Sequence, residues 1–302
     1  MQPRLHTITM KGIISLVFLF LCAVAFSQNA THVVVLGFDG MSPNGIKNAN
    51  TPNFDELVKN GSHTFHAHAV MPTSSSSNWA SMIMGAPPKK HGIFTNKWDR
   101  IDGRKQTFCG RRKGRLWPTV FGVIRNQRRH LKIACFHDWG RFGRLTDRYA
   151  FNRLESSINE MRTARRAAHY IKRKKPDFLF LHFDHVDHAG HMLGHGTPEY
   201  FKAVEVADSL AGVIINALKQ AGIFENTIIL VTADHGGIGK GHGGPTLEEV
   251  EIPWIISGPG IKKGFEITEP VETFYTAPTL TKIFGVTPPD CWTGKPVLSV
   301  FE

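Results

Sequence analysis

The amino-acid sequence predicts an α/β fold with a mostly parallel central sheet. Continuous apolar runs at 31–38, 178–183 and 227–233 are typical of strands that are buried on both faces of a sheet. Helical segments separate these runs along the chain, as they do in βαβ units. Each run also ends in carboxylates or imidazoles, and open α/β sheets bind ligands at the carboxyl ends of their strands.

The remaining elements follow from local signals in chain order. A helix is expected after Thr51, a natural N-cap followed by Pro52, and the clearest amphipathic helix begins at Thr197 and ends at Gly222. Further strands are expected at 131–136 and 252–256, and further helices at 79–85, 118–127, 157–173 and 276–284.

Composition describes an ordinary globular protein. The chain has 302 residues, of which 41% are hydrophobic and 20% are charged, so it can bury a sizeable core. We find no internal repeat and no obvious linker in the sequence. One catalytic domain at 28–302 is therefore expected.

Residues 1–27 are interpreted as a cleaved signal peptide. Arg4 and Lys11 precede an apolar run at 13–26 that is short for a membrane span, and the small residues Ala25 and Ser27 suit a signal peptidase. We expect a secreted or periplasmic protein without a stable membrane span after cleavage. An uncleaved anchor is the alternative.

The charge and the cysteines set further expectations. Removing residues 1–27 lowers the formal net charge from +11 to +9, with basic clusters at 111–115, 128–129 and 172–175. These clusters could steer an anionic substrate or could be solvated faces, and no nucleic-acid-binding motif is present. Cys109 and Cys291 could pair, whereas Cys135 lies in an apolar run and is expected to be buried. The oligomeric state is not predicted.

Two of the strand ends offer oxygen and nitrogen ligands for a transition metal. Asp39 follows the first strand, and Asp234 and His235 follow the strand at 227–233. His242 lies in the glycine-rich loop after them. This ligand chemistry suits zinc in particular.

The third strand end has a surplus of candidate ligands. Asp187 and His191 lie four residues apart and converge if the segment is helical, although Asp184 could replace Asp187. His182 alternates with the strand and is expected in the core or against a ligand.

A run of four serines, 74–77, leads into a predicted helix. A hydroxyl at a helix N-terminus lies where backbone N–H groups favour anions, which suits a nucleophile that attacks phosphate. An ordinary serine N-cap is the simpler interpretation. Together with two metals about 4 Å apart, such a hydroxyl would form a site for phosphoryl or sulfuryl transfer.

Several short motifs combine into a resemblance to the alkaline phosphatase superfamily, and within it to the type I phosphodiesterase/nucleotide pyrophosphatase family. They are F-D-G (38–40), T-P-N (51–53), P-T-x-S-x-x-N (72–78), D-x-x-G-H (187–191), D-H-G (234–236), G-H-G-G (241–244), G-P-G (258–260) and G-K-P-V (294–297). The resemblance covers essentially the whole chain after residue 27. It implies a three-layer α/β/α sandwich.

The resemblance also implies roles for single residues. It implies that Asp187, His191 and His242 bind one divalent metal, and that the other metal is bound by Asp39, Asp234, His235 and the nucleophile. The nucleophile corresponds to Ser75, where many relatives carry threonine, and the neighbouring serines leave its register open. Asn78 corresponds to a donor to a phosphate oxygen. A covalent phospho-serine intermediate follows.

The expected function is thus hydrolysis of small, nucleotide-like phosphate diesters by an exported enzyme with two metal ions, zinc being favoured. About 275 residues leave no room for a large cap domain, so substrate choice is assigned to loops at 94–117 and 139–156. One alternative is a phosphomonoesterase, with a clamp supplied by Arg141, Arg144 or the cluster at 111–115. A second is a non-catalytic relative that binds metal or phosphate. A sulfatase is disfavoured because its nucleophile motif is missing from the sequence.

Overall fold

One eight-stranded sheet organises the protein. The computed structural model describes residues 30–100, 109 and 116–302, and the expected signal peptide lies outside them. The strand order is β4-β3-β5-β1-β6-β7-β2-β8. The strands are β1 (His32–Phe38), β2 (Gly61–His68), β3 (Ile133–His137), β4 (Arg153–Ser156), β5 (Phe178–Phe183), β6 (Thr227–Ala233), β7 (Glu251–Ser257) and β8 (Phe265–Glu266).

The central part of the sheet is parallel. β1 pairs in parallel with both β5 and β6, and β3 pairs in parallel with β4 and β5. Among the strands that the structure describes, β7 alone runs against its neighbours β6 and β2. Since β1, β5 and β6 are adjacent and parallel, their carboxyl ends meet at one edge, as the sequence predicts.

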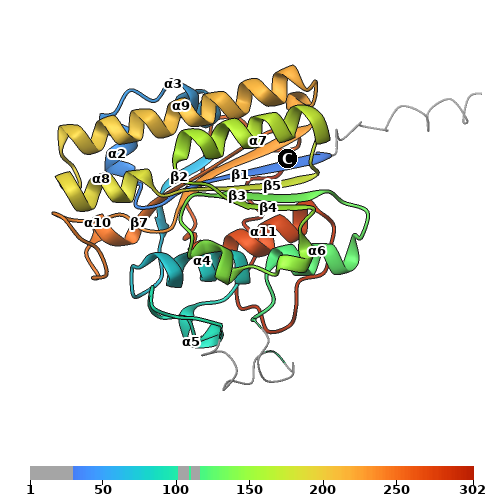
Figure 1. Ribbon diagram of the computed structural model, residues 1–302, viewed down its shortest axis with the longest axis horizontal. Helices are drawn as coiled ribbons and strands as arrows, with labels where there is room; N and C mark the ends of the chain where they lie inside the picture. Colours follow the sequence, from blue (N-terminus) through green and yellow to red (C-terminus); the bar gives the residue numbers. More distant parts are fainter. Residues whose placement is uncertain (1–29, 101–108, 110–115) are drawn as a thin grey trace, which may run out of the picture.

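Helices cover both faces of the sheet (Figure 1). One layer holds α3 (Pro52–Lys59), α7 (Glu160–Lys174) and α9 (Pro198–Gln220), and the other holds α4 (Ser75–Met84), α6 (Val120–Gln127) and α11 (Thr276–Ile283). The expected three-layer α/β/α sandwich is confirmed. The shorter helices are α2 (Pro43–Asn48), α5 (Pro88–His91), α8 (His185–Leu193) and α10 (Leu247–Val250).

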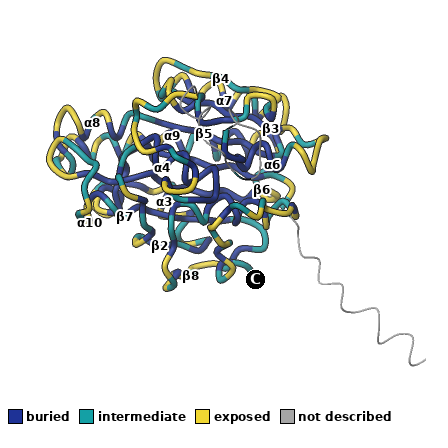
Figure 2. The backbone as a smooth tube through the Cα atoms, turned by 90° about the horizontal axis from the view of Figure 1, so that it is seen from below, coloured by how far each residue is buried: buried dark blue, intermediate teal, exposed yellow. Residues whose placement is uncertain are grey.

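The core lies between the sheet and its two helical layers. Every residue of β5 and β6 is buried, as expected for strands covered on both faces (Figure 2). Trp79 of α4 and Tyr200 of α9 are among the largest fully buried side chains and lie on opposite faces of the sheet. This packing fixes the carboxyl edge of the sheet from both sides.

Three strands lacked a clear sequence signal. β4 is a short edge strand of sequence R-L-E-S, β8 has two residues, and β2 mixes histidines with small residues. Their pairing with the rest of the sheet, rather than an apolar run, makes them strands. Helix α4 also begins earlier than the sequence suggests, since the serines at 75–77 form its first turn.

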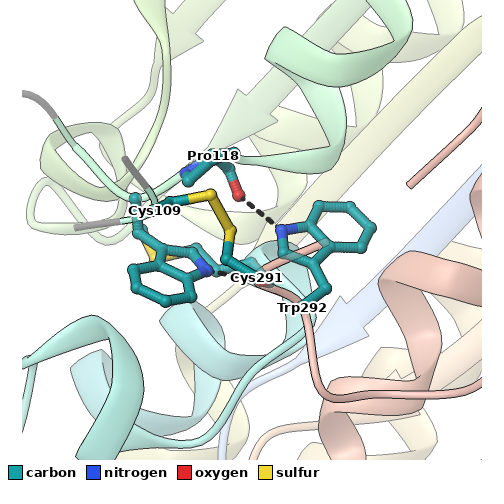
Figure 3. The surroundings of a disulfide bond; sticks show 6 residues. Cys109, Pro118, Cys291 and Trp292 are labelled. Atoms are coloured by element: carbon teal, nitrogen blue, oxygen red, sulfur yellow. Dashed lines mark hydrogen bonds between the residues drawn. A yellow bond between two sulfur atoms is a disulfide. The ribbon is translucent and has the colours of Figure 1, made fainter. Parts of the chain in front are cut away.

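Cys109 and Cys291 form a disulfide with a Cα–Cα distance of 5.3 Å, the pairing that the sequence allowed but could not decide. Beside it, Trp292 donates its indole N–H to the carbonyl of Pro118 at 3.1 Å (Figure 3). Together these contacts tie the C-terminal segment to the start of α6. Cys135 is a buried free thiol, as expected, and burial raises its pKa.

None of the helices within residues 30–100 and 116–302 has both the length and the apolar character needed to cross a membrane.

Candidate metal centre

The carboxyl edge of the sheet brings together side chains that are far apart in the sequence. Asp39 follows β1, Asp187 and His191 lie on α8 just after β5, and Asp234 and His235 follow β6. The loop that carries His242 returns to the same edge. In Figure 1 this is the end of the sheet at which α8 and α10 lie.

The first group of possible ligands consists of Asp39, Asp234 and His235. One ligand atom from each lies within 4.8 Å of the others, and all three side chains are fully buried. The His235 Nε2 atom is 3.4 Å from Asp39 Oδ1 and 3.3 Å from Asp234 Oδ2.

The second group consists of Asp187, His191 and His242. Their ligand atoms also lie within 4.8 Å of one another. His191 Nε2 is 3.3 Å from Asp187 Oδ2, and His242 Nε2 is 3.7 Å from Asp187 Oδ1. The rings of His242 and His235 stack with centroids 3.9 Å apart, so the two groups are adjacent.

Backbone carbonyls orient all three imidazoles. The Nδ1 atoms of His191, His235 and His242 lie 2.9, 2.7 and 2.7 Å from the carbonyl oxygens of residues 240, 236 and 73. A carbonyl accepts a hydrogen bond, so each Nδ1 carries the proton and each Nε2 presents a lone pair to the cluster. This is the arrangement found around metal-binding histidines.

In Asp39 and Asp234, one carboxylate oxygen accepts a hydrogen bond from the protein and the other oxygen faces the cluster of possible ligands. Asp39 Oδ2 accepts the indole N–H of Trp79 at 2.8 Å, and Asp234 Oδ1 accepts the backbone N–H of Gly40 at 3.1 Å. The remaining oxygens, Asp39 Oδ1 and Asp234 Oδ2, are buried without a hydrogen-bond partner, as is Asp187 Oδ1.

Electrostatics also point to a cation. Burial and the charge of Asp39 raise the pKa of Asp187 to about 6, and the same two causes raise the pKa of Asp234 well above its usual value. Burial lowers the pKa of His235. Buried carboxylate oxygens that lack a hydrogen-bond donor and converge with imidazole Nε2 atoms fit divalent metal ions, which would neutralise the charge and satisfy the orphaned oxygens.

His182 lies beneath Asp39, as the sequence suggested. The ring is fully buried, with Nε2 3.3 Å from Asp39 Oδ2 and Nδ1 3.7 Å from Asp138 Oδ1. Burial opposes protonation of His182, but its contacts with the carboxylates of Asp138 and Asp39, and their charges, raise its pKa to about 9. Burial raises the pKa of Asp39, but the contact with His182 and the charge of the imidazole rings lower it, so that the net shift is downward.

Gly40 is required by the close approach of α8. Its φ is +67°, a conformation that favours glycine, and a Cβ atom there would lie 2.7 Å from the Cβ of Asp187. Tyr200 donates its hydroxyl to the carbonyl of Gly40 at 2.8 Å and so holds the turn after β1.

Ser75 lies at the first residue of α4, next to the first ligand group. Its Oγ atom is 3.4 Å from His235 Nε2, and the side chain is largely buried at the edge of the cluster. Ser74 is the N-cap residue, and the hydroxyls of Ser74 and Ser77 contact each other at 3.0 Å. Of these serines, Ser75 is the one in contact with a candidate ligand.

The expectation for Asn78 is wrong. Its Oδ1 atom accepts the N–H of Val70 at 2.6 Å, and its Nδ2 atom faces the carbonyls of Val70, Pro72 and Ser74 at 3.1–3.2 Å. Both amide hydrogens are therefore directed at the backbone, and none remains for a phosphate oxygen. Asn78 instead fixes the segment that leads into α4.

Asn96 was not singled out from the sequence, although it lies in the loop expected to line the substrate pocket. Its Oδ1 atom accepts the backbone N–H of Ser76 at 2.8 Å, so its amide group sits at the N-terminus of α4. Within the described residues, no hydrogen bond occupies its Nδ2 group. The side chain of Arg141 donates to the backbone carbonyl of Asn96, which joins the loops at 94–100 and 139–146.

The other candidates of the histidine-rich segment lie outside both ligand groups. His185 contacts the carbonyl of Ala203 at 3.1 Å, and His188 is exposed on α8. Asp184 is not part of either group, so α8 brings in Asp187 instead. His195 is buried 4.0 Å from Asp187 Oδ1 and packs against that ligand.

Comparison with known proteins decides the family. The family model described as type I phosphodiesterase/nucleotide pyrophosphatase matches residues 33–239. The chain belongs to this family. Ser75 and five of the six residues of the two ligand groups fall inside the matched segment, and the sixth, His242, follows it by three residues.

Two curated members illustrate the relationship. Venom phosphodiesterase 2 of Crotalus adamanteus is 25% identical over 233 residues, which are 71% of this chain and 28% of the relative. Human bis(5'-adenosyl)-triphosphatase ENPP4 is 23% identical over 212 residues, 68% of this chain and 47% of the relative. The chain therefore spans about a quarter to a half of the length of these family members.

Several solved structures share the fold of this chain. Murine ectonucleotide pyrophosphatase/phosphodiesterase 5, an inactive variant in complex with AMP, superposes with a TM-score of 0.73 at 17% identity and covers 90% of this chain and 100% of that chain. A 2-O GAG sulfatase superposes with a TM-score of 0.69 at 14% identity, over 89% of this chain and 73% of that chain. These similarities support the alkaline phosphatase-like architecture.

Proposed function

We propose that the protein is an exported phosphodiesterase or nucleotide pyrophosphatase with two metal ions. The observation that supports this most is the contact between Ser75, at the N-terminus of α4, and one of two adjacent ligand groups. A nucleophile beside paired metal sites is an arrangement that catalyses phosphoryl transfer. The catalytic domain is proposed to be 28–302, after a signal peptide at 1–27.

The first proposed metal site comprises Asp39, Asp234, His235 and Ser75, and the second comprises Asp187, His191 and His242. Nitrogen and carboxylate ligands of this kind suit zinc. Bound there, two divalent cations would supply Lewis acidity, lower the pKa of the serine hydroxyl and of water, and offset negative charge on the phosphate.

The proposed reaction has two steps, and both take place at Ser75. Ser75 Oγ loses its proton to solvent and attacks phosphorus, the bond to the leaving oxygen breaks, the leaving group takes up a proton from solvent, and a covalent phosphate ester of Ser75 forms. Water then attacks the phosphorus of that ester, the bond to Ser75 Oγ breaks, and the serine hydroxyl is regenerated as a phosphate monoester is released. Asn96, whose carbonyl end is fixed by Ser76, is proposed to donate its amide N–H to a non-bridging phosphate oxygen, in the role first expected of Asn78.

A diester substrate agrees with the surroundings of the site. A monoester carries an additional charge that an arginine clamp would match. Arg141, however, donates to the carbonyl of Asn96, and Arg144 donates to the carbonyl of Trp98 and pairs with Asp99. These arginines hold the loops together, and the cluster at 111–115 lies outside the described residues.

A small nucleotide-like substrate and a site of action outside the cell are part of the same proposal. Relatives are named venom phosphodiesterases and ectonucleotide pyrophosphatases, and one neighbouring structure holds AMP. These names support, for this chain, an anionic phosphate ester that is met after export.

The experiment compares bis-p-nitrophenyl phosphate with p-nitrophenyl phosphate as substrates of the purified protein reconstituted with zinc. We expect kcat/KM to be at least tenfold higher for the diester. Ser75→Ala should abolish turnover and leave metal content unchanged, whereas the matched Ser77→Ala variant should retain activity. A preference for the monoester would reassign the protein as a phosphatase. Full activity of Ser75→Ala would refute the choice of nucleophile, and zinc-loaded protein that turns over neither ester would indicate a non-catalytic relative.

A further inference from the structure

A basic groove lies between α7 and the edge strand β4. It has a volume of about 590 Å³, within the range of roughly 300–1,000 Å³ that is usual for small-molecule sites. None of its lining residues belongs to the two metal-ligand groups. The lining consists of Phe136, Arg153, Glu155, Arg165, Arg166, His169, Tyr170, Arg173 and Lys174.

The lining is strongly positive. It contains four arginines and one lysine against one carboxylate, a formal net charge of +4 with His169 neutral. Glu155 pairs with both Arg153 and Arg166 and so holds two guanidinium groups in place. Over residues 30–100 and 116–302, the structure shows no ion pair for the side chains of Arg165, Arg173 or Lys174.

The exposed face of α7 enlarges this positive field. The helix buries Ala164, Ala167 and Ile171 against the sheet, and its exposed face carries arginines and lysines. The sequence from 161 to 175 contains no Asp or Glu at all.

One wall of the groove is aromatic. Tyr170 is half-buried and packs edge-to-face against Phe136, with ring centroids 5.7 Å apart. Within the described part of the chain, the Tyr170 hydroxyl makes no hydrogen bond. A ring beside several guanidinium groups can contact a planar base while the arginines bind phosphate oxygens in bidentate fashion.

We propose that this groove binds a nucleoside polyphosphate at a second site, separate from the metal centre. Arg165 and Arg173 contact the phosphates, and Tyr170 contacts the base. A concave site of this volume favours a small molecule over the flat surface of a lipid bilayer or the length of a nucleic acid. The proposal does not depend on the catalytic activity.

The test counts equivalents of adenosine 5'-(α,β-methylene)triphosphate that bind to the full-length, zinc-loaded protein in isothermal titration calorimetry. The methylene bridge blocks cleavage between the α and β phosphates. The Arg165→Ala/Arg173→Ala double variant should lose one equivalent relative to wild type, or bind it at least tenfold more weakly. This difference holds whether or not the metal centre binds the same probe.

Matched variants make the outcome specific. Lys59→Ala/Lys263→Ala removes the same charge from exposed positions outside the groove and should bind as wild type does. Alanine favours helix, so the groove variant should fold, and circular dichroism checks this. Equal binding by wild type and the groove variant, or equal weakening in both double variants, would overturn the proposal.

Two further probes distinguish other ligands. Inorganic tripolyphosphate should bind the groove at least tenfold more weakly than the nucleotide, and Tyr170→Ala should remove that difference. Tripolyphosphate that binds as tightly as the nucleotide would refute the contact between the base and Tyr170. Cosedimentation with phosphatidylserine vesicles that requires Arg165 and Arg173, without nucleotide binding, would overturn the proposal in favour of a membrane surface.

Discussion

Trp79 donates its indole N–H to Asp39 Oδ2 at 2.8 Å, which links the helix of the nucleophile to a metal ligand at the end of β1. Both side chains are fully buried. The bond holds one carboxylate oxygen and leaves the other, Oδ1, facing His235 at 3.4 Å. This contact, together with the contact between Ser75 and His235, positions α4 relative to the proposed first metal site.

Replacing Trp79 with phenylalanine should weaken this site. The change removes the donor to Asp39, and loss of such a contact to a metal ligand typically lowers metal affinity by about 10–100-fold. Zinc titration against a competing chelator measures the affinity. Trp292→Phe, which removes an indole donor to Pro118 instead, is the control and should bind zinc as wild type does. Equal affinity in the Trp79→Phe variant would show that the contact does not orient Asp39.

Removing His242 should empty one of the two proposed sites. His242 and His191 direct their Nε2 atoms toward each other at 3.1 Å, and two lone pairs at that distance repel each other unless a cation lies between them. His242→Ala should reduce bound zinc from two equivalents to one, as measured by elemental analysis after dialysis. His188→Ala, an exposed neighbour on α8, should keep both. Two equivalents in the His242→Ala variant would contradict the proposed ligand set.

The stability of the protein should decrease on acidification because of His91. Burial lowers the pKa of His91 from 6.5 to about 3. Its Nδ1 atom accepts the N–H of Ile93, and its Nε2–H group faces Ser81 Oγ at 2.9 Å. Protonation of Nδ1 in the folded protein would break the hydrogen bond from Ile93. Below about pH 6.5 the His91 side chain binds a proton in the unfolded chain but stays neutral in the folded protein. The free energy of unfolding therefore falls as the pH falls toward 3.

Urea denaturation of wild type and His91→Gln between pH 7 and pH 4 measures this effect. The variant should show a shallower dependence of unfolding free energy on pH than wild type. His130→Gln, a change at an exposed residue, should reproduce the wild-type slope. Parallel curves for wild type and His91→Gln would exclude His91 as a source of acid sensitivity.

The disulfide should stabilise the fold. Cys109 and Cys291 are 182 residues apart in the sequence, and closing so long a loop restricts the unfolded chain. Cys109→Ser/Cys291→Ser should lower the free energy of unfolding by about 2–5 kcal/mol in urea denaturation. Dithiothreitol should lower the stability of wild type by a similar amount and leave the double variant unchanged. An equal loss in the variant upon reduction would mean that reduction acts elsewhere.

The sequence predicted the parts of the fold that carry strong periodicity. Buried apolar runs identified β1, β5 and β6, and capping signals identified α9 within two residues of its ends. The strands β2, β4 and β8 were not predicted, because pairing with neighbouring strands stabilises them and their sequences carry no strong strand pattern.

For the site, the residue types and the strand ends were sufficient to propose two metal ions, and the family resemblance divided the ligands into two groups. The rule that parallel strands share a carboxyl edge predicts that Asp39, Asp187 and Asp234 converge, and the structure brings them together. The role expected of Asn78 could not be judged in this way. A motif position could not reveal that both amide hydrogens of Asn78 bind the backbone, nor that Asn96 faces the N-terminus of α4.

The sequence by itself determined the α/β class, the family and the residue types of the site, because these depend on local periodicity and short motifs. Tertiary structure alone decided which hydroxyl of the four serines contacts His235, which cysteines pair and which asparagine faces the site. It alone also placed the arginines of α7 beside β4 to form a groove. The physical reason is that orientation and contact depend on packing between segments far apart in the chain, whereas strand and helix signals depend on neighbouring residues.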